Sequence, residues 1–463
     1  MKTIETDYLI IGAGAMGMAF VDVLLRETSA TFVIVDKYDQ PGGHWNTAYP
    51  FVRLHQPSEF YGVASKALGA RHIDKVGWNA GLYELASVGE VCAYFDQVMQ
   101  QQFLPSGRVT FLPMSEYRGN GRVVSLVSGE QIDVAARRTV DATYMRVTVP
   151  SMREPPYAVD EGVVCIPPNE LPKRAAHFHG YTVVGAGKTG MDACLWLLKQ
   201  GVDPGRITWI TPRDSWLVDR GLTQPAEQFA ESTRAVMAGQ MQAISSATSV
   251  SDLMKRINGC GRLLKLERAD IPTMYRCATV SKAEIEQLQR IENVVRLGRV
   301  RRIRRDEILL DAGAIATDPQ TLFVDCTADG LEKRPIVPVF SDSRITLQAL
   351  RSCQQVFSAA LIAHIEAAYE EEDRKNDLAT PVPHPDTDVD FLRVTIANAQ
   401  NQIKWDSDPA LREWLSQCRL DMWGKLMPVP LGQSPQDDAL RASRRAAAEA
   451  MCRKLDELLG SES

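Results

Sequence analysis

The chain has 463 residues, of which 45% are hydrophobic and 24% charged, a composition typical of a soluble globular protein. This length is too great for one ordinary hydrophobic core, so it predicts two or more domains. The formal net charge of -6, from 52 basic and 58 acidic residues, argues against a general nucleic-acid-binding protein.

The first twenty residues superficially resemble a secretion signal, because they contain one lysine and a short apolar run. Acidic Glu5 and Asp7 precede the run, however, and glycines interrupt it, so we interpret this stretch as a strand and a loop. No segment has the roughly 18 unbroken apolar residues that a membrane span requires. The sequence therefore predicts no membrane partner and a cytoplasmic protein.

A dinucleotide-binding motif follows the short apolar strand at residues 8–11. Its three glycines have G-x-G-x-x-G spacing, an apolar helix follows them, and a second strand ends on an acidic residue. The first glycine makes a tight turn, the second lets the backbone approach a pyrophosphate, and the third lets helix and strand pack closely. The acidic residue can accept hydrogen bonds from the adenosine ribose, and the helix N-terminus faces the diphosphate. The predicted site residues are Gly12, Gly14, Gly17, Asp36 and the adjacent Lys37. The motif does not distinguish FAD from NAD.

The next segment, PGGHWNTAYPFVRLHQPSEF at residues 41–60, resembles the class B flavoprotein monooxygenases. These are the flavin-containing monooxygenases, the Baeyer–Villiger enzymes and their N-hydroxylating relatives. The shared pattern is Gly-Gly-x-Trp, then Tyr-Pro, then an Arg and a Pro, here Gly42, Gly43, Trp45, Tyr49, Pro50, Arg53 and Pro57. In that group the segment runs along the flavin side of FAD. The resemblance therefore implies FAD here, with Gly43, Trp45 and Arg53 at the cofactor.

The same resemblance gives one candidate catalytic residue. His55 falls where members of the group have an Asn or His close to the flavin ring, and it could donate to the flavin or to bound oxygen. A histidine in a structural hydrogen bond is the alternative. Asp329 and Arg220 are weaker candidates. No catalytic triad or acid–base pair is evident, and none is required, because the cofactor carries the difficult chemical step.

A second strand–glycine–helix unit begins with the apolar strand at residues 181–184. Its predicted site residues are Gly185, Gly187, Lys188, Thr189 and Gly190. The run Gly187-Lys188-Thr189 imitates the end of a P-loop, but the first P-loop glycine would then fall on Thr182, inside the strand. We therefore interpret this unit as a second dinucleotide site.

Arg213 follows the second strand of this unit, where the first unit has Asp36. A carboxylate there would repel a 2′-phosphate, whereas a guanidinium can pair with it, so the sequence favours NADPH over NADH. The Arg-x-x-Trp pattern of Arg213 and Trp216 also resembles the NADPH segment of the flavin monooxygenases. An ordinary surface arginine is the alternative.

Two short apolar strands that end in Asp, at residues 140–141 and 322–325, resemble the points where such flavoproteins cross between domains; the second adds Asp325 to the site residues. The predicted fold is α/β, with two Rossmann-like dinucleotide-binding domains, the second inserted in the first, and a helical C-terminal tail. The FAD domain would comprise 1–150 and 321–463, and the NAD(P)H domain 178–320. A Pro-rich linker at 151–177 and a mostly helical insertion near 227–277, a candidate lid, complete the prediction. The arginines at positions 296–305 are spaced with apolar residues, which favours a solvated strand or hairpin over a binding patch.

The nine cysteines are odd in number and scattered, which predicts reduced thiols. The absence of a Cys-x-x-Cys pair excludes the redox-active dithiol of a thioredoxin-reductase type of enzyme.

Two dinucleotide sites would let NADPH reduce FAD, and the resemblance implies oxygen transfer from dioxygen to an N, S, C or ketone centre of a small molecule. One observation departs from the resembled group, because its Phe-x-Gly-x-x-x-His pattern is absent from residues 155–180. Two alternatives stay open: an NAD(P)H:acceptor reductase or oxidase without oxygenation, and a flavin-binding sensor or partner-binding protein. No metal site is predicted.

Overall fold

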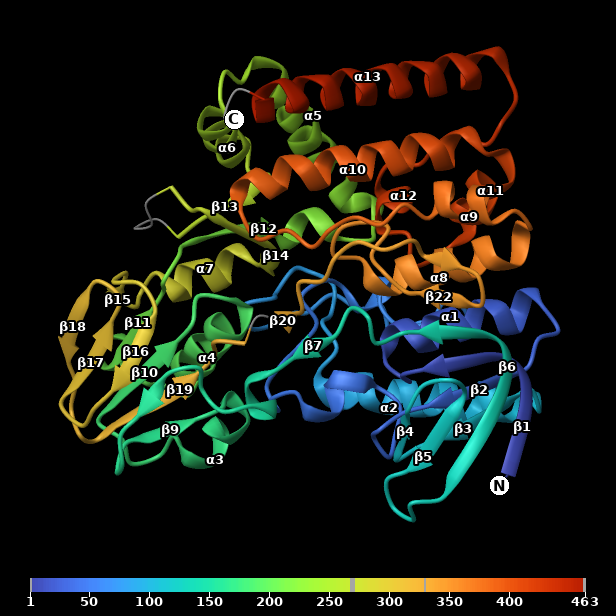
Figure 1. Ribbon diagram of the computed structural model, residues 1–463. Helices are drawn as coiled ribbons and strands as arrows, with labels where there is room; N and C mark the ends of the chain where they lie inside the picture. Colours follow the sequence, from blue (N-terminus) through green and yellow to red (C-terminus); the bar gives the residue numbers. More distant parts are fainter. Residues whose placement is uncertain (1, 267–270, 329, 461–463) are drawn as a thin grey trace.

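The computed structural model describes residues 2–266, 271–328 and 330–460, and two mainly parallel sheets organise it (Figure 1). The first sheet has the strand order β21-β22-β6-β1-β2-β3, in which the five strands from β22 to β3 are parallel. In spatial order these strands are β21 (Phe340–Ser341), β22 (Arg344–Thr346), β6 (Gln131–Asp141), β1 (Lys2–Ile11), β2 (Phe32–Val35) and β3 (Val109–Leu112).

Side chains of the first sheet alternate between its two faces, as they must in a β-strand. Tyr8 and Ile10 pack with three helices, whereas Leu9, between them, packs beneath a small hairpin. The helices are α1 (Ala15–Glu27), α2 (Val88–Val98) and α8 (Gln355–Ala368). The hairpin is β4 (Ser115–Tyr117) with β5 (Arg122–Ser125), which also pairs with β6.

The second sheet repeats this plan with the all-parallel order β15-β11-β10-β19-β9. Its strands are β15 (Asn293–Val295), β11 (Ile207–Ile210), β10 (Gly180–Val184), β19 (Thr321–Asp325) and β9 (Val164–Ile166). The helices α4 (Lys188–Lys199) and α7 (Lys282–Leu288) pack on one face. The other face is covered by a small sheet of β16 (Val300–Ile303), β17 (Glu307–Leu310) and β18 (Gly313–Ala316). In this sheet β16 also pairs with β8 (Ala158–Val159).

The two sheets confirm the predicted fold class, because β3-β2-β1-β6 and β15-β11-β10-β19 follow the same spatial order. The arginine-rich segment is the predicted hairpin, since β16 and β17 are antiparallel and Arg301, Arg302 and Arg304 pair with carboxylates. The chain leaves the first sheet through β7 (Val147–Thr148) and returns through β20 (Gly330–Leu331), and these two strands pair with each other. The second unit is thus inserted in the first.

The strand pairing corrects two predicted boundaries. Residues 158–166, which we expected in the linker, supply β8 and β9, and residues 321–325, which we expected in the first domain, supply β19 of the second sheet. Short strands in a Pro-rich stretch are hard to detect, because their pairing partners lie more than a hundred residues away. The short helix α3 (Leu171–Arg174) follows β9.

The segment expected to be a mostly helical insertion is helical only in its first part. Helices α5 (Ala230–Ser246) and α6 (Val250–Gly259) are followed by β13 (Leu263–Leu264) and β14 (Met274–Val280). Both strands pair with β12 (Ser215–Asp219), which explains why the second part is extended. The four residues at 267–270 lie outside the described residues.

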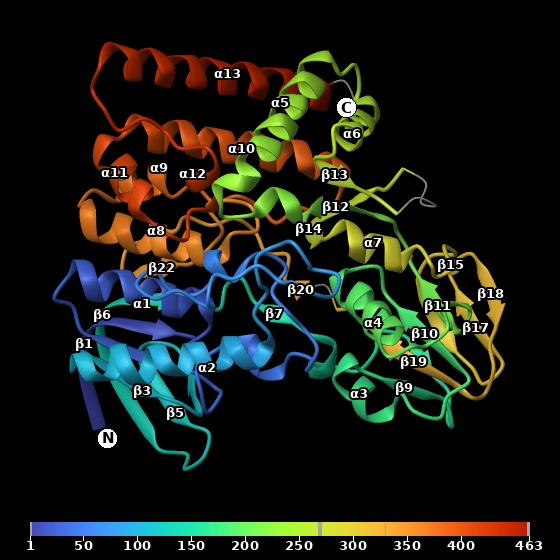
Figure 2. The same ribbon diagram turned by 180° about the vertical axis from the view of Figure 1, so that it is seen from behind.

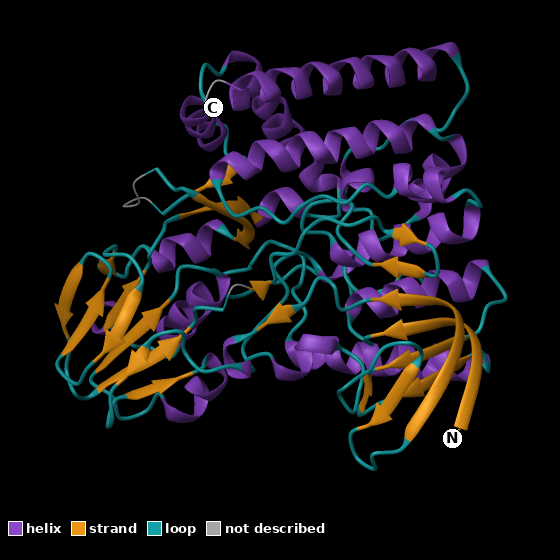
Figure 3. Ribbon diagram, viewed as in Figure 1, coloured by secondary structure: helices purple, strands orange, loops and turns teal. Residues whose placement is uncertain are grey.

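The predicted helical tail packs on this insertion. Figures 1 and 2 show α10 and α13 lying beside α5 and α6, and Figure 3 shows that this layer is almost entirely helical. Phe391 of α10, Leu455 of α13 and Ile244 of α5 share one hydrophobic core. The tail helices are α9 (Glu372–Leu378), α10 (Asp388–Ser407), α11 (Pro409–Gln417), α12 (Met422–Leu426) and α13 (Pro435–Gly460). None of the helices within the described ranges is long and apolar enough to cross a membrane.

Candidate functional site

One cavity of about 840 Å³ is lined by both glycine-rich turns. Gly12 and Gly14 line it from the first sheet, and Gly187, Lys188 and Thr189 line it from the second. Since these turns begin α1 and α4, the N-termini of both helices border the cavity, which is where a helix favours a negatively charged group. In the described part of the chain, no three His, Cys, Asp or Glu side chains are grouped so as to hold a metal ion.

The three glycines of the first turn have different structural roles. Gly12 has φ +104°, which favours glycine, and a Cβ at Gly17 would clash with the carbonyl oxygen of Gly12. At Gly14 an added Cβ would meet only the Cα of Gly43, at 3.6 Å, so this backbone is open to the cavity. Asp36 lines the cavity and also fixes the turn, because its carboxylate accepts hydrogen bonds from the Ala13 amide (2.6 Å) and from the Tyr38 amide (2.9 Å). Burial raises the pKa of Asp36.

The second turn has the same distribution of roles. Gly185 has φ +130°, and a Cβ there would lie 2.6 Å from the Cys326 carbonyl oxygen; a Cβ at Gly190 would clash with the Gly185 carbonyl oxygen. A Cβ at Gly187 would meet nothing within 4 Å. Each turn therefore has two glycines that packing requires and a middle glycine that faces open space, which is the arrangement a bound pyrophosphate needs.

The segment at residues 41–60 lies between the two turns and contacts both. Gly43 approaches the first turn so closely that a Cβ on it would be 2.9 Å from the Cα of Gly14. Tyr49 donates a hydrogen bond to Asp192 of α4 (2.7 Å), and Lys188 pairs with the same carboxylate. Trp45 is 8% exposed, lines the cavity and donates to the Tyr61 hydroxyl (2.7 Å).

His55 and Arg53 of the same segment also line the cavity. Burial, together with the nearby Lys188 and Arg220, holds the pKa of His55 well below its usual range, so its imidazole is neutral. Arg220 itself is fully buried and does not line the cavity. It donates to the His55 carbonyl oxygen (2.9 Å) and pairs with Glu284 (2.8 Å), so it positions the His55 backbone.

Six predicted cofactor-binding residues do not line the cavity: the packing glycines Gly17, Gly185 and Gly190, and also Trp216, Asp325 and Arg213. Trp216 is 1% exposed and packs in the core shared with α5 and α6. Asp325 is 2% exposed and accepts hydrogen bonds from Thr327 (2.6 Å) and Tyr157 (3.2 Å), so it holds the turn after β19. Arg213 forms an ion pair with Asp386 (3.0 Å). The candidate Asp329 lies outside the described residues.

Asp386, which precedes α10, gathers three cations. Besides Arg213, it contacts Arg276 and Lys333, the last at 2.8 Å. Burial disfavours the ionised form of Asp386, but hydrogen bonds from Lys333, Arg213 and Arg276 outweigh it and lower the pKa far below its usual range. Sequence reasoning missed this cluster, because its members lie on four separate segments.

Sequence reasoning also missed several polar atoms of the cavity. Gln354 and Gln355, at the start of α8, line it, and so does His384. The Nε2 atom of Gln354, both amide atoms of Gln355 and the Nδ1 atom of His384 are buried without a hydrogen-bond partner. Buried polar atoms are nearly always paired in native proteins, so these atoms indicate that the cavity holds a polar ligand. No motif marks these positions.

The cavity also contains a disulfide between Cys277 and Cys353, which differs from the expectation of nine reduced thiols. The two residues are 76 positions apart, so no spacing pattern could have indicated the pair. The other seven cysteines, all within the described ranges, are free.

Comparison with known proteins places the chain in a family. It is 55% identical over 435 residues to the uncharacterized proteins Rv2000 of Mycobacterium tuberculosis and Mb2023 of Mycobacterium bovis, covering 94% of this chain and 81% of each relative. The chain belongs to the same protein family as these mycobacterial proteins. No family model matches the sequence.

Solved structures with a related arrangement have much lower sequence identity. A flavin-containing monooxygenase from Stenotrophomonas maltophilia is 17% identical, with 75% of this chain and 87% of that chain covered and a TM-score of 0.43. An oxidized steroid monooxygenase bound to NADP is 14% identical, with 78% and 85% covered and a TM-score of 0.49. An open form of cyclohexanone monooxygenase is 14% identical, with 78% and 88% covered and a TM-score of 0.48.

The lowered pKa values of two cavity histidines predict how the free energy of unfolding depends on pH. Burial lowers the pKa of His384 to about 4, with Arg276 adding to the effect, and burial alone lowers that of His44 to about 4. Between about pH 7 and pH 5 the unfolded chain takes up protons on these imidazoles and the folded chain does not, so the free energy of unfolding falls as the pH is lowered. We expect His384→Gln to lose less stability over this range than the wild type in urea unfolding. The exposed His179→Gln serves as control. An identical pH dependence in all three proteins would contradict the buried, neutral state of His384.

Proposed function

We propose that this protein is an NADPH-dependent FAD oxidoreductase that transfers oxygen to a small-molecule substrate. The observation that carries the proposal is the single cavity lined by both glycine-rich turns. Two separate nucleotide sites would not allow a hydride to pass directly from one cofactor to the other, whereas a shared cavity does. The proposal also includes dioxygen as co-substrate.

The first turn fits FAD. Gly14 leaves room for a diphosphate at the N-terminus of α1, and the carboxylate of Asp36 lies at the end of β2, where an adenosine ribose is bound in such folds. Gly43, Trp45 and Arg53 would hold the remaining part of the cofactor. The unpartnered amide of Gln355 offers an NH₂ donor group and a carbonyl acceptor, which match a heterocycle whose edge carries both an acceptor and a donor.

The second turn fits a nicotinamide dinucleotide, with Gly187, Lys188 and Thr189 at its diphosphate. Support for NADPH comes from the cluster around Asp386. Arg213, Arg276 and Lys333 all contact the carboxylate of Asp386, and a 2′-phosphate could pair with the same cationic side chains.

When bound, FAD would accept a hydride from NADPH and pass the electrons to dioxygen or another acceptor. This chain would bind the cofactors side by side and exclude water from the space between them. His55 is neutral, so it can donate one hydrogen bond and accept another without bringing a charge to the site. Support for oxygen transfer comes from the resemblance of residues 41–60 to class B flavoprotein monooxygenases. The second candidate, an NAD(P)H:acceptor reductase, is favoured by the disulfide in the cavity.

Substitution at the two middle glycines tests the cofactor assignment. Because a Cβ at Gly14 or Gly187 meets little protein, we expect Gly14→Val and Gly187→Val both to fold. Gly14→Val should yield colourless protein, since its side chain would occupy the diphosphate position, whereas Gly187→Val should keep FAD and lose NADPH-dependent flavin reduction. The measurement is the flavin released on denaturation, with the exposed Gly89→Val as control. Full FAD content in Gly14→Val would show that the first turn does not bind it.

The 2′-phosphate assignment predicts a difference between the two nicotinamide cofactors. Arg213→Ala should raise the KM for NADPH about ten- to a hundredfold, the value of one charge-assisted hydrogen bond of about 1.5–3 kcal/mol, and leave that for NADH nearly unchanged. Arg296→Ala, which removes a similar half-buried ion pair with Asp214, is the matched control. Equal effects of Arg213→Ala on both cofactors would mean that Arg213 does not contact the 2′-phosphate.

The fate of the electrons distinguishes the two candidate reactions. With a panel of amines, thioethers and ketones under ¹⁸O₂, we expect a substrate that lowers the hydrogen peroxide released per NADPH and appears as product with one labelled oxygen atom. Mass spectrometry of the products measures the label. If NADPH is oxidised without any labelled product and quinones or dyes accept electrons much faster, the reductase is the correct assignment. If pure protein with bound FAD does not oxidise NADPH under any of these conditions, it is a binding protein.

A further inference from the structure

The disulfide between Cys277 and Cys353 lies where electrons would pass through the cavity. Cys277 belongs to β14 and Cys353 lies two residues before α8, so the bond joins the insertion to the first domain. Both residues are half-buried and both line the cavity that the glycine-rich turns share. A disulfide that only stabilises the fold has no need to border a cavity.

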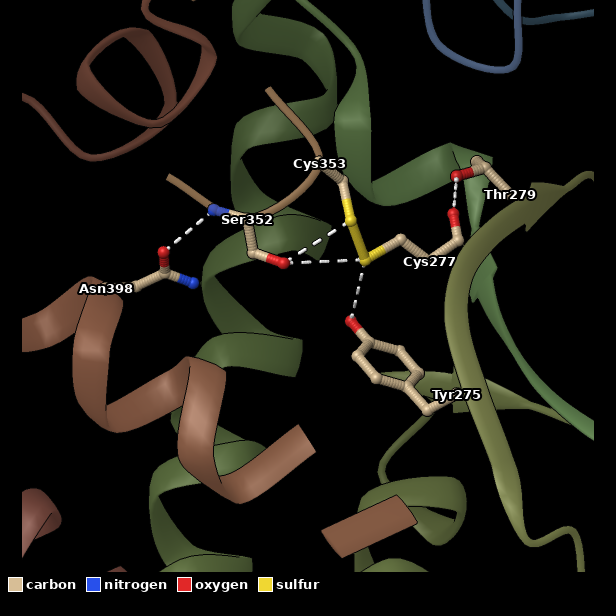
Figure 4. The surroundings of a disulfide bond; sticks show 6 residues. All are labelled: Tyr275, Cys277, Thr279, Ser352, Cys353 and Asn398. Carbon is tan, nitrogen blue, oxygen red and sulfur yellow. Dashed lines mark hydrogen bonds between the residues drawn. A yellow bond between two sulfur atoms is a disulfide. The ribbon is translucent and has the colours of Figure 1, made fainter. Parts of the chain in front are cut away.

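The groups around the sulfur atoms favour their reduced, charged form. Figure 4 shows the hydroxyl groups of Tyr275 and Ser352 pointing at the disulfide. The Tyr275 oxygen is 3.7 Å from the Cys277 sulfur, and the Ser352 oxygen is 3.6 Å from it and 3.3 Å from the Cys353 sulfur. A disulfide sulfur carries no hydrogen, so both hydroxyls are the donors, and a thiolate would accept these bonds more strongly.

The position of Cys353 adds a second stabilising effect. It precedes the N-terminus of α8, a helix of 14 residues, and the dipole of a helix favours a negatively charged group at that end. Ser352 is held in place because its amide donates to Asn398 of α10 (2.9 Å) (Figure 4). A reactive pair of cysteines needs such an environment, and an inert one does not.

The backbone at both cysteines is unusual. Cys277 has φ +56° and Cys353 has φ +63°, values in the left-handed region that a non-glycine residue seldom adopts. Strained conformations of this kind cost free energy and are concentrated at functional sites. The surrounding structure therefore holds both cysteines of this bond in backbone conformations that cost free energy.

We propose that Cys277 and Cys353 form a redox-active pair that accepts two electrons in the cavity and passes them to an external disulfide. The proposal rests on the proposed function, which supplies the electrons. In the first step the S–S bond breaks and each sulfur becomes a thiol. The two electrons and one hydrogen nucleus derive from the hydride of a dihydronicotinamide, which becomes oxidised, and the second proton comes from water.

In the second step one of the two thiols loses its proton, and the resulting thiolate attacks an external disulfide. A mixed disulfide forms, and the first external thiolate leaves and takes up one proton. The second cysteine then loses its proton, attacks the mixed disulfide, restores the Cys277–Cys353 bond and releases the second external thiolate, which takes up the other proton. The net reaction oxidises one dihydronicotinamide and converts one external disulfide into two thiols.

Differential alkylation of the holoenzyme tests the first step. The protein with bound FAD is mixed with NADPH without oxygen, its flavin absorbance is recorded, and free thiols are alkylated before and after chemical reduction with reagents of different mass. We expect the flavin to bleach and the peptides carrying Cys277 and Cys353 to take up the first reagent, whereas without NADPH they take up only the second. A bleached flavin with an intact disulfide overturns this proposal alone. A flavin that stays oxidised overturns the proposed function and this proposal with it.

The second step is tested with 5,5′-dithiobis(2-nitrobenzoate) as the external disulfide. Cys277→Ser and Cys353→Ser should each abolish NADPH-dependent release of thionitrobenzoate and accumulate one mixed disulfide on the remaining cysteine, detected as an added mass. Cys260→Ser, which removes a free, half-buried cysteine that does not line the cavity, should react as the wild type does. Undiminished release by either of the first two variants would overturn the proposal.

Discussion

The contact between residues 41–60 and α4 is the constraint on which the rest of the structure depends. Tyr49 reaches from the first domain to Asp192 of the second, and Lys188 pairs with the same carboxylate. The contact is sheltered, because Lys188 and Asp192 each have 12% of their side chains exposed. Through Gly43 the same segment touches the first glycine-rich turn. One segment therefore sets the distance and orientation between the two turns, and the shared cavity follows from this.

The features that could be predicted from the sequence are those that a local residue pattern encodes. The glycines at 12, 14 and 17 have the predicted division between packing and open backbone, and those at 185, 187 and 190 repeat it, because both roles follow from strand–turn–helix geometry. The strand at residues 274–280 was not predicted, since its partner is β12, some sixty residues earlier. The Asp386 cluster, the unpartnered amide of Gln355 and the Cys277–Cys353 bond were missed for a related reason. Each depends on segments that meet only in the folded chain, and none leaves a spacing pattern.

The cavity offers two acceptors for the electrons of a reduced cofactor, dioxygen and the disulfide. The segment at residues 41–60 resembles enzymes that use dioxygen, whereas the disulfide offers the same electrons a route to sulfur. His55 faces the cavity as a neutral group, and Cys353 lines the same cavity just before the N-terminus of α8. The two routes require the same reduced cofactor, so their competition depends on which acceptor reaches it first.

The central claim is that both nucleotides bind in one cavity, with their reactive rings facing each other. The most direct test is a crystal structure of the protein with FAD and NADP bound. The account predicts the FAD diphosphate at Gly14, the NADP diphosphate at Gly187, and the nicotinamide next to the flavin within the cavity bordered by residues 41–60. A structure with either diphosphate away from its turn, or with the two rings in separate cavities, would contradict it.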